Sequence, residues 1–221
     1  RGKNSRRDML IDRLLTLSGE RRPDAVALVT ASSRITYGEL HDKASRFSAA
    51  LKELGVRRGD RVAIALENSE EYMAAHFGVL LSGGVSVPVY QSLPSASFNR
   101  IAADCAPAVV ISRPQFFRGL TKASGEKDKA RHIIAGPVSD LEKAGGAVSF
   151  ADCLSCSPST DKETRTQDDL ATIIYTSGTT GDPKGVMLSH RNLRANTTSI
   201  VSYLGLTSED SVMVVLPFYY S

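Results

Sequence analysis

Apolar and polar positions follow two different periods along this chain. Short apolar runs typical of buried strands occur at residues 61–66, 85–90, 108–112 and 170–176. Between them, apolar residues recur every three or four positions, as they do on one face of a helix. Strands that alternate with helices of this length predict βαβ crossovers and a largely parallel sheet covered by helices on both faces. We therefore expect an α/β fold of layered, largely parallel sheets.

The first part of the chain predicts two helices separated by a hairpin. Ser5 and Asp8 have the spacing of a capping box, so we expect the first helix to begin there. Two short strands at residues 25–30 and 35–37 flank a polar turn, which is typical of a hairpin. The apolar spacing across residues 40–54 predicts the second helix.

Further elements follow at regular intervals. The pattern predicts helices at residues 69–82 and 95–105, a helix after Pro114 and a short strand at 132–136. Cys105 falls on the apolar face of its helix, so we expect it in the core. The chain ends just after another strand-like run.

Two segments differ from this pattern. Residues 1–7 form a basic tail that we expect to be solvated, with a phosphate or membrane contact as the alternative. Residues 157–169 are the least apolar window, which predicts a solvated, mobile loop. The remainder of residues 8–221 is expected to form one domain.

Composition excludes several classes of protein. With 42% apolar and 23% charged residues the chain is globular rather than disordered, and a formal charge of +3 is too small to indicate nucleic acid as a partner. No apolar run approaches the roughly 20 residues of a transmembrane helix. Cys153 and Cys156 form one C-x-x-C, but a zinc or redox site is the less favoured interpretation without further ligands. We expect no metal site and a reducing, cytoplasmic setting.

A loop rich in glycine and hydroxyl residues follows the apolar strand at 170–176. Phosphate oxygens need several converging donors, which backbone amides of a glycine-rich turn, hydroxyls and a lysine can supply. The loop offers these groups in Gly178, Gly181, Gly185, Ser177, Thr179, Thr180 and Lys184. It is not a Walker loop, because Lys184 follows Asp-Pro and precedes glycine. A solvent-exposed linker is the alternative.

A second strand follows this loop, and a helix is predicted to start at the Ser189 cap. His190 at the start of that helix is interpreted as a surface or hydrogen-bonding residue rather than a catalyst.

Residues 175–185, YTSGTTGDPKG, resemble the signature loop of the AMP-forming adenylating enzymes. That superfamily contains acyl-CoA synthetases, adenylation domains of nonribosomal peptide synthetases and beetle luciferases. Three further stretches resemble the family's motifs in order: ITYGEL at 35–40, LLSGGVSVPVY at 80–90 and LPFYY at 216–220. The resemblance spans nearly the whole chain.

The resemblance implies a reaction in two steps. A carboxylate attacks the α-phosphorus of ATP to give an acyl-adenylate and pyrophosphate, and a thiol such as that of CoA then takes the acyl group. The phosphates would be held, with Mg²⁺ assisting, by Thr176, Ser177, Gly178, Thr179, Thr180, Gly181 and Lys184. Lys184 is then a phosphate ligand rather than a base.

The aromatic motif implies the acyl and thiol pocket. By resemblance, Phe218, Tyr219 and Tyr220 line it, although Tyr220 stands where many acyl-CoA synthetases have a histidine. The alternative is that these aromatics are core residues at the end of a strand. Tyr90 stands near a position that is usually acidic in peptide synthetases, so the resemblance favours a medium- or long-chain fatty acid.

The later elements of the family have no counterpart in these 221 residues. They are an acidic residue that binds the ribose, a hinge, and a small C-terminal domain with a catalytic lysine. We therefore expect an incomplete large N-terminal domain, assign no catalytic residue here, and expect the isolated chain to bind nucleotide weakly or not at all. Exposed sheet edges would allow self-association. Two alternatives stay open: a domain that loads an amino acid or acyl group onto a carrier protein, and a non-catalytic binding module.

Overall fold

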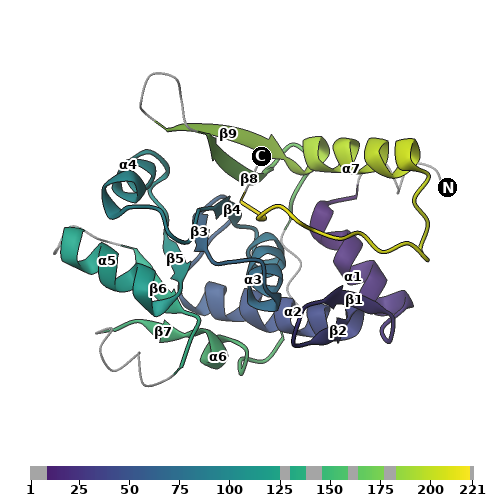
Figure 1. Ribbon diagram of the computed structural model, residues 1–221, viewed down its shortest axis with the longest axis horizontal. Coiled ribbons are helices and arrows are strands. Elements are labelled where there is room, and N and C mark those ends of the chain that lie inside the picture. Colours follow the sequence, from purple (N-terminus) through teal and green to yellow (C-terminus); the bar gives the residue numbers. More distant parts are fainter. Residues whose placement is uncertain (1–8, 125–129, 138–145, 159–163, 177–182, 220–221) are drawn as a thin grey trace.

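A seven-stranded sheet forms the centre of the molecule (Figure 1). The computed structural model describes residues 9–124, 130–137, 146–158, 164–176 and 183–219. Within them the strand order is β7-β6-β5-β3-β4-β8-β9, and every neighbouring pair is parallel except β8 and β9. The strands are β3 (Arg61–Ala65), β4 (Val85–Pro88), β5 (Val109–Ser112), β6 (Arg131–Ile134), β7 (Val148–Ser149), β8 (Leu170–Thr176) and β9 (Lys184–Ser189). The predicted α/β fold with a largely parallel sheet is confirmed.

Helices cover both faces of this sheet. On one face lie α2 (Tyr37–Glu53) and α3 (Glu70–Leu81), and on the other lie α4 (Ser95–Cys105) and α5 (Pro114–Ser124). Successive strand residues point to opposite faces, so Val62 and Ile64 of β3 pack with α2 and α3, whereas Ala63 and Ala65 pack with α4 and α5. Both sides of the strand are therefore buried, which explains its continuous apolar run.

The N-terminal hairpin was predicted correctly, but the first helix begins later than predicted. Strands β1 (Val26–Val29) and β2 (Arg34–Thr36) pair antiparallel. Helix α1 (Ile11–Arg21) has Leu10 at its N-cap without a side-chain cap, so the predicted start at Ser5 is wrong. The backbone N–H of Ile11 donates instead to Nδ1 of His190, at 3.3 Å. A tertiary contact here takes the place of a local cap.

The C-terminal segment divides into a helix and an extended stretch. Helix α7 (His190–Leu204) begins as predicted at a capping box formed by Ser189 and Asn192, and ends at Gly205 in the left-handed region. The strand-like run at residues 211–215 forms no strand, and its side chains are exposed; that of Met213 is 85% exposed. No neighbouring strand of the described chain pairs with this run, so its β propensity alone does not produce a strand.

Part of the polar window at residues 157–169 is covered by the fold. Of its described residues, Gln167 is buried, and the side chain of Arg165 is only 7% exposed and reaches the buried carboxylate of Asp12. Charged residues give the window its polar composition, but two of its side chains are covered by the fold. A short helix, α6 (Phe150–Cys153), precedes the window. None of the helices in the described ranges is long and apolar enough to cross a membrane.

Candidate functional site

The carboxyl ends of the parallel strands form the edge where the predicted site residues gather. The connection after β3 runs through α3 on one face of the sheet, and the connection after β4 runs through α4 on the other. Neighbouring strands whose connections leave toward opposite faces create a crevice beyond their carboxyl ends, which is where ligands bind in open α/β sheets. Strand β8 is parallel to β4, so the loop that follows β8 starts from the same edge.

Asn68, in the connection between β3 and α3, holds the aromatic segment at this edge. Its Nδ2 donates to the carbonyl of Leu216 at 3.0 Å, and its Oδ1 accepts from the backbone N–H of Phe218 at 2.8 Å. These two bonds fix the backbone of a segment nearly 150 positions away in the sequence. Sequence reasoning missed Asn68. Its place after a buried strand and next to the Ser69 helix cap was the available signal.

The aromatic rings continue this contact. The ring of Phe218 lies 5.0 Å from that of Tyr72 between centroids, and the ring of Tyr219 lies 5.1 Å from that of Tyr90. Phe218 also packs against the larger core cluster, so it is partly a core residue. Phe218 and Tyr219 therefore lie beside residues that follow β3 and β4, whereas Tyr220 lies outside the described residues.

A charged cluster lies beside Asn68. Nε of Arg113, directly after β5, donates to Glu67 at 2.9 Å, and the guanidinium lies 3.5 Å from Glu71. Burial alone would raise the pKa of Glu67, but the hydrogen bond and charge of Arg113 hold the pKa of this carboxyl below its ordinary value. The charges of Glu67 and Arg113 are therefore paired with each other at this edge of the sheet.

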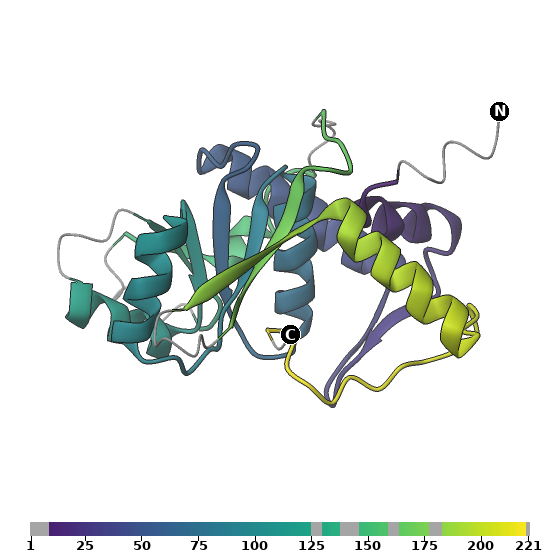
Figure 2. The same ribbon diagram turned by 90° about the horizontal axis from the view of Figure 1, so that it is seen from above.

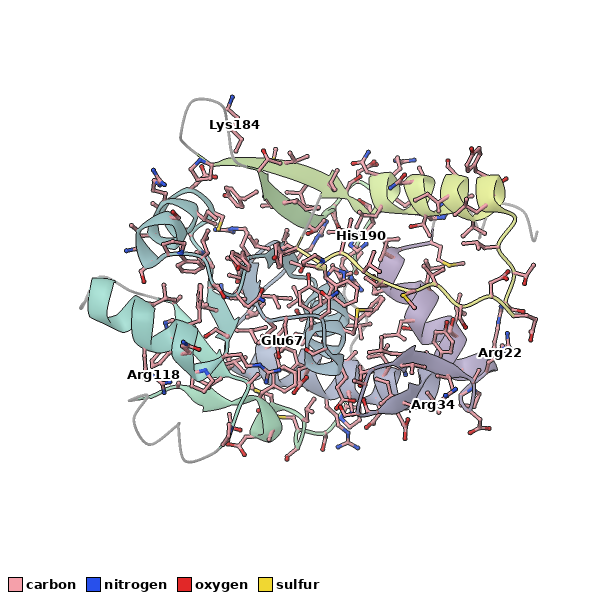
Figure 3. The ribbon with its side chains drawn as sticks, viewed as in Figure 1. Arg22, Arg34, Glu67, Arg118, Lys184 and His190 are labelled. Carbon is pink, nitrogen blue, oxygen red and sulfur yellow. The ribbon has the colours of Figure 1, made fainter. Side chains whose placement is uncertain are left out.

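The predicted phosphate loop joins β8 to β9. Thr176 and Lys184 form the last pair of this antiparallel hairpin, so the two ends of the loop are held side by side. Ser177, Gly178, Thr179, Thr180 and Gly181 lie outside the described residues. Lys184 is exposed and points away from the body of the protein (Figure 3). We name Tyr175, Thr176, Lys184 and Gly185 the hairpin tip.

Gly185 has a different role from the one predicted. It was expected to give the loop conformational freedom, but it is an extended residue of β9 and is absent from the described glycines with positive φ. A Cβ at this position would lie 2.9 Å from Cγ2 of Ile173 and 3.1 Å from Cζ of Tyr175. Glycine is needed here because the Tyr175 ring fills the space that a side chain would occupy.

The other end of the hairpin is held by buried polar contacts. The hydroxyl of Thr172 donates to the carbonyl of Ser86 at 2.8 Å. The guanidinium of Arg165 makes two bonds, of 3.1 and 2.9 Å, to the carboxylate of Asp12 and also donates to the carbonyl of Leu80. We name Thr172, Ser86, His76, Asp12, Arg165 and His190 the hairpin base.

His190 is a buried member of the base. Its side chain is 1% exposed, so the surface interpretation is wrong, whereas its hydrogen bond with Ile11 confirms the hydrogen-bonding one. Burial lowers the pKa of His190, although Asp12 opposes this. Because Nδ1 accepts from Ile11, a neutral His190 carries its proton on Nε2.

The C-x-x-C pair has the character of ordinary thiols. Burial raises the pKa of Cys153 to about 12, and burial together with Glu53 raises the pKa of Cys156. Reactive cysteines have lowered pKa values, so these thiols stay protonated at neutral pH. In the part of the chain that the structure describes, no three His, Cys, Asp or Glu side chains gather as metal ligands would.

Comparison with known proteins shows the family of this chain. A family model described as "AMP-binding enzyme" matches residues 15–221. Tyrocidine synthase 2 of Brevibacillus parabrevis is 32% identical over 93% of this chain and 5% of its own length. The mitochondrial malonate–CoA ligase ACSF3 of Homo sapiens is 31% identical over 89% of this chain and 33% of its own.

Among solved structures, ATP-bound MatB of Rhodopseudomonas palustris superposes with a TM-score of 0.81 at 30% identity, covering 96% of this chain and 41% of that one. This chain therefore spans less than half of the length of each of these three proteins. The match over nearly the whole chain, the signature hairpin and the shared fold lead to one conclusion: the chain belongs to the AMP-binding enzyme family.

Proposed function

We propose that the protein containing this chain activates a carboxylic acid with ATP to an acyl-adenylate and transfers the acyl group to CoA, releasing AMP and pyrophosphate. The observation that carries the proposal is the signature stretch at 175–185, in which Thr176 and Lys184 are paired on either side of the loop that leaves the carboxyl edge of the sheet. Such an edge is the ordinary place for a nucleotide in an open α/β sheet.

Each part of the hairpin tip and loop has a role in this proposal. Thr176, Ser177, Gly178, Thr179, Thr180, Gly181 and Lys184 hold the β- and γ-phosphates, and the ammonium of Lys184 balances their charge. Its exposed position leaves this ammonium open to a nucleotide. Mg²⁺ takes oxygen ligands and is held in such sites largely by the phosphates, so the Thr176 hydroxyl is a suitable neighbour.

We further propose a medium- or long-chain fatty acid as the substrate. The argument rests on Tyr90, which adds an aromatic ring near a position that is usually acidic in peptide synthetases. Its contact with Tyr219 supports an apolar wall for the acyl chain. Phe218, Tyr219 and Tyr220 complete that wall in this proposal.

A second candidate is an adenylation domain that loads an amino acid or acyl group onto a carrier protein. The 32% identity with tyrocidine synthase 2 favours it. CoA dependence separates the two, because a domain that serves a carrier protein needs no CoA. A non-catalytic binding module is the third candidate, and adenylation of any acid would exclude it.

The test is acid-dependent exchange of labelled pyrophosphate into ATP by the longest natural polypeptide that contains this sequence. The acids run from acetate to long fatty acids and include amino acids. We expect exchange with fatty acids and formation of acyl-CoA when CoA is added. The Lys184→Ala variant should lose about a hundredfold in exchange, because one preorganised charge on the phosphates is removed.

The matched control is Lys43→Ala, which removes the same charge from α2, where Lys43 pairs with Glu70 at 3.2 Å. This control should keep wild-type exchange. Exchange with amino acids alone would move the protein to the second candidate, and exchange with no acid would contradict the enzyme proposal. Substantial acyl-CoA formation by the isolated 221 residues would contradict our expectation that they form an incomplete domain that binds nucleotide weakly or not at all.

We also propose a reducing, cytoplasmic location and self-association of this chain through exposed sheet edges. The three free cysteines support the first, and the exposed residues Val186 and Met187 on edge strand β9 support the second. Cell fractionation tests the location. Light scattering of the isolated chain against concentration tests the association, and a monomer at every concentration would contradict it.

A further inference from the structure

The hairpin tip projects beyond the part of β8 that is paired with the sheet. The register between β4 and β8 joins Ser86 to Thr172, whereas β8 continues to Thr176 and is paired there with β9. A two-stranded ribbon alone is only marginally stable in water. The tip therefore needs a second support if its loop is to keep one position.

Helix α4 provides this support. Figures 1 and 2 both show the free end of the hairpin lying beside α4. The hydroxyl of Tyr175 donates to the carboxylate of Asp104 near the C-terminus of α4. The ring of Tyr175 packs against the core cluster that contains Phe98 and Ile101 of the same helix. One side chain thus gives the tip a hydrogen bond to α4 and an apolar contact with the core cluster to which α4 contributes.

The position of Asp104 supports a specific role for this bond. A carboxylate near the C-terminus of a helix is unfavourable, because the helix dipole is negative there. Burial and the hydrogen bond with Asp104 raise the pKa of Tyr175, so its hydroxyl stays a donor at neutral pH. The carboxylate of Asp104 therefore keeps a hydrogen-bond donor at neutral pH, and this donor belongs to the hairpin tip.

Gly185 is part of the same arrangement. It is the cross-strand partner of Tyr175, and it leaves room for the ring that reaches over to α4. The ring, the glycine and the carboxylate together determine where Thr176 and Lys184 stand, because these two residues are the next pair in the hairpin.

We propose that Tyr175 is a positioning residue for ATP: its bond to Asp104 holds the hairpin tip on α4 and sets the position of the two ends of the phosphate loop. This inference rests on the proposed function of that loop. The hairpin base fixes one end of the ribbon through buried contacts, and the Tyr175–Asp104 bond fixes the other. Loss of the Tyr175–Asp104 bond weakens the binding of ATP and leaves the binding of the acid unchanged.

The test compares Tyr175→Phe, Asp104→Ala and the double variant in the polypeptide used for the exchange assay. Each single change should raise KM for ATP about twofold, as expected for the loss of one exposed hydrogen bond, and leave KM for the acid unchanged. The double variant should equal Tyr175→Phe, because the phenylalanine ring already lacks the hydroxyl that contacts both Asp104 and Cys105. Asp104→Asn, which keeps an acceptor, should recover most of the affinity.

Two further measurements complete the test. The matched control is Tyr203→Phe, which removes a hydroxyl from a side chain that is 89% exposed on α7, and it should behave as wild type. Trypsin cleavage after Lys184, measured without nucleotide, should become faster in Tyr175→Phe and Asp104→Ala. This readout is independent of enzymatic activity.

The outcomes separate the two proposals. Wild-type cleavage and wild-type KM for ATP in both variants would overturn the positioning role. Equal rises of KM for ATP and for the acid, with a lower unfolding midpoint, would also overturn it, because they indicate a general structural effect. If the wild-type protein shows no exchange with any acid, the proposed function fails, and unchanged cleavage in the variants would then overturn the positioning role separately.

Discussion

The two ends of the β8–β9 hairpin are held in different ways. At the hairpin base, the side chains of Asp12, Arg165 and His190 are 0%, 7% and 1% exposed. At the hairpin tip, Lys184 is exposed, and Tyr175 bonds to Asp104 at the protein surface. Both ends use charges and hydrogen bonds, so the difference lies in their access to water.

Because of this difference, we expect the hairpin base to stabilise the fold and the hairpin tip to position the phosphate loop. Removing one partner of a buried ion pair leaves an uncompensated charge in a medium of low polarity, which is costly. An exposed pair is screened by water and contributes little to the free energy of unfolding. We therefore expect changes at the base to affect folding, and changes at the tip to affect ATP binding.

The largest effect is expected at Asp12. Asp12→Ala leaves the Arg165 guanidinium buried without its carboxylate and should lower the free energy of unfolding by about 3 kcal/mol. Urea denaturation measures this change. The matched control is Asp168→Ala, which removes a carboxylate bonded to Arg191 where the two side chains are 72% and 56% exposed. A similar loss in both variants would contradict the role of burial.

The second effect is a dependence of the free energy of unfolding on pH, which we expect from His76 in the hairpin base. Burial, with nearby His190 adding to it, lowers the pKa of His76 to about 4, and its Nδ1 lies 3.0 Å from the Ser86 hydroxyl. The unfolded chain, with a pKa near 6.5, binds more protons between these values, so the free energy of unfolding rises with pH there. The contribution is complete above about pH 6.5 and is lost toward pH 4.

Between pH 7 and 5 this loss should be about 2 kcal/mol. Urea denaturation at both pH values measures it. His76→Gln, which cannot gain a proton, should show a smaller difference between the two pH values than the wild type. An equal difference would assign the pH dependence to other groups.

The third effect is expected at Gly185. A methyl group there meets Ile173 and the Tyr175 ring, so Gly185→Ala should cost about 1 kcal/mol of folding free energy and raise KM for ATP by displacing the ring. Val186→Ala, at an exposed residue of the same strand, is the control and should not change KM for ATP. If Gly185→Ala has the wild-type KM for ATP, displacement of the Tyr175 ring does not affect ATP binding.

The smallest effect is expected on the free energy of unfolding of the Tyr175→Phe variant. The ring and its apolar contacts remain, and the lost bond lies at the surface, so the free energy of unfolding should change by less than about 0.5 kcal/mol. A loss comparable with that of Asp12→Ala would remove the distinction between base and tip. Thermal or urea denaturation of this variant next to Asp12→Ala decides between the two results.

Local patterns along the chain predicted much of the fold. The apolar runs of β3, β4, β5 and β8 and the capping box at Ser189 are properties of neighbouring residues, so they could be read directly. The signature at 175–185 is equally local, and the family it indicates was confirmed. The predicted helix start at Ser5 failed because a partner far away in the chain replaced the local cap.

The sequence by itself therefore determined the α/β class, the order of most elements and the family to which the chain belongs. Only the tertiary structure decided that the side chain of Arg165 is buried, that Asn68 holds the aromatic segment, and that Gly185 makes room for Tyr175. The partners of Arg165 and Asn68 lie about 150 positions away, and pairing at such distances depends on which elements the folded sheet brings together. Burial likewise depends on the tertiary structure, because the surroundings of a side chain decide it rather than the type of the side chain.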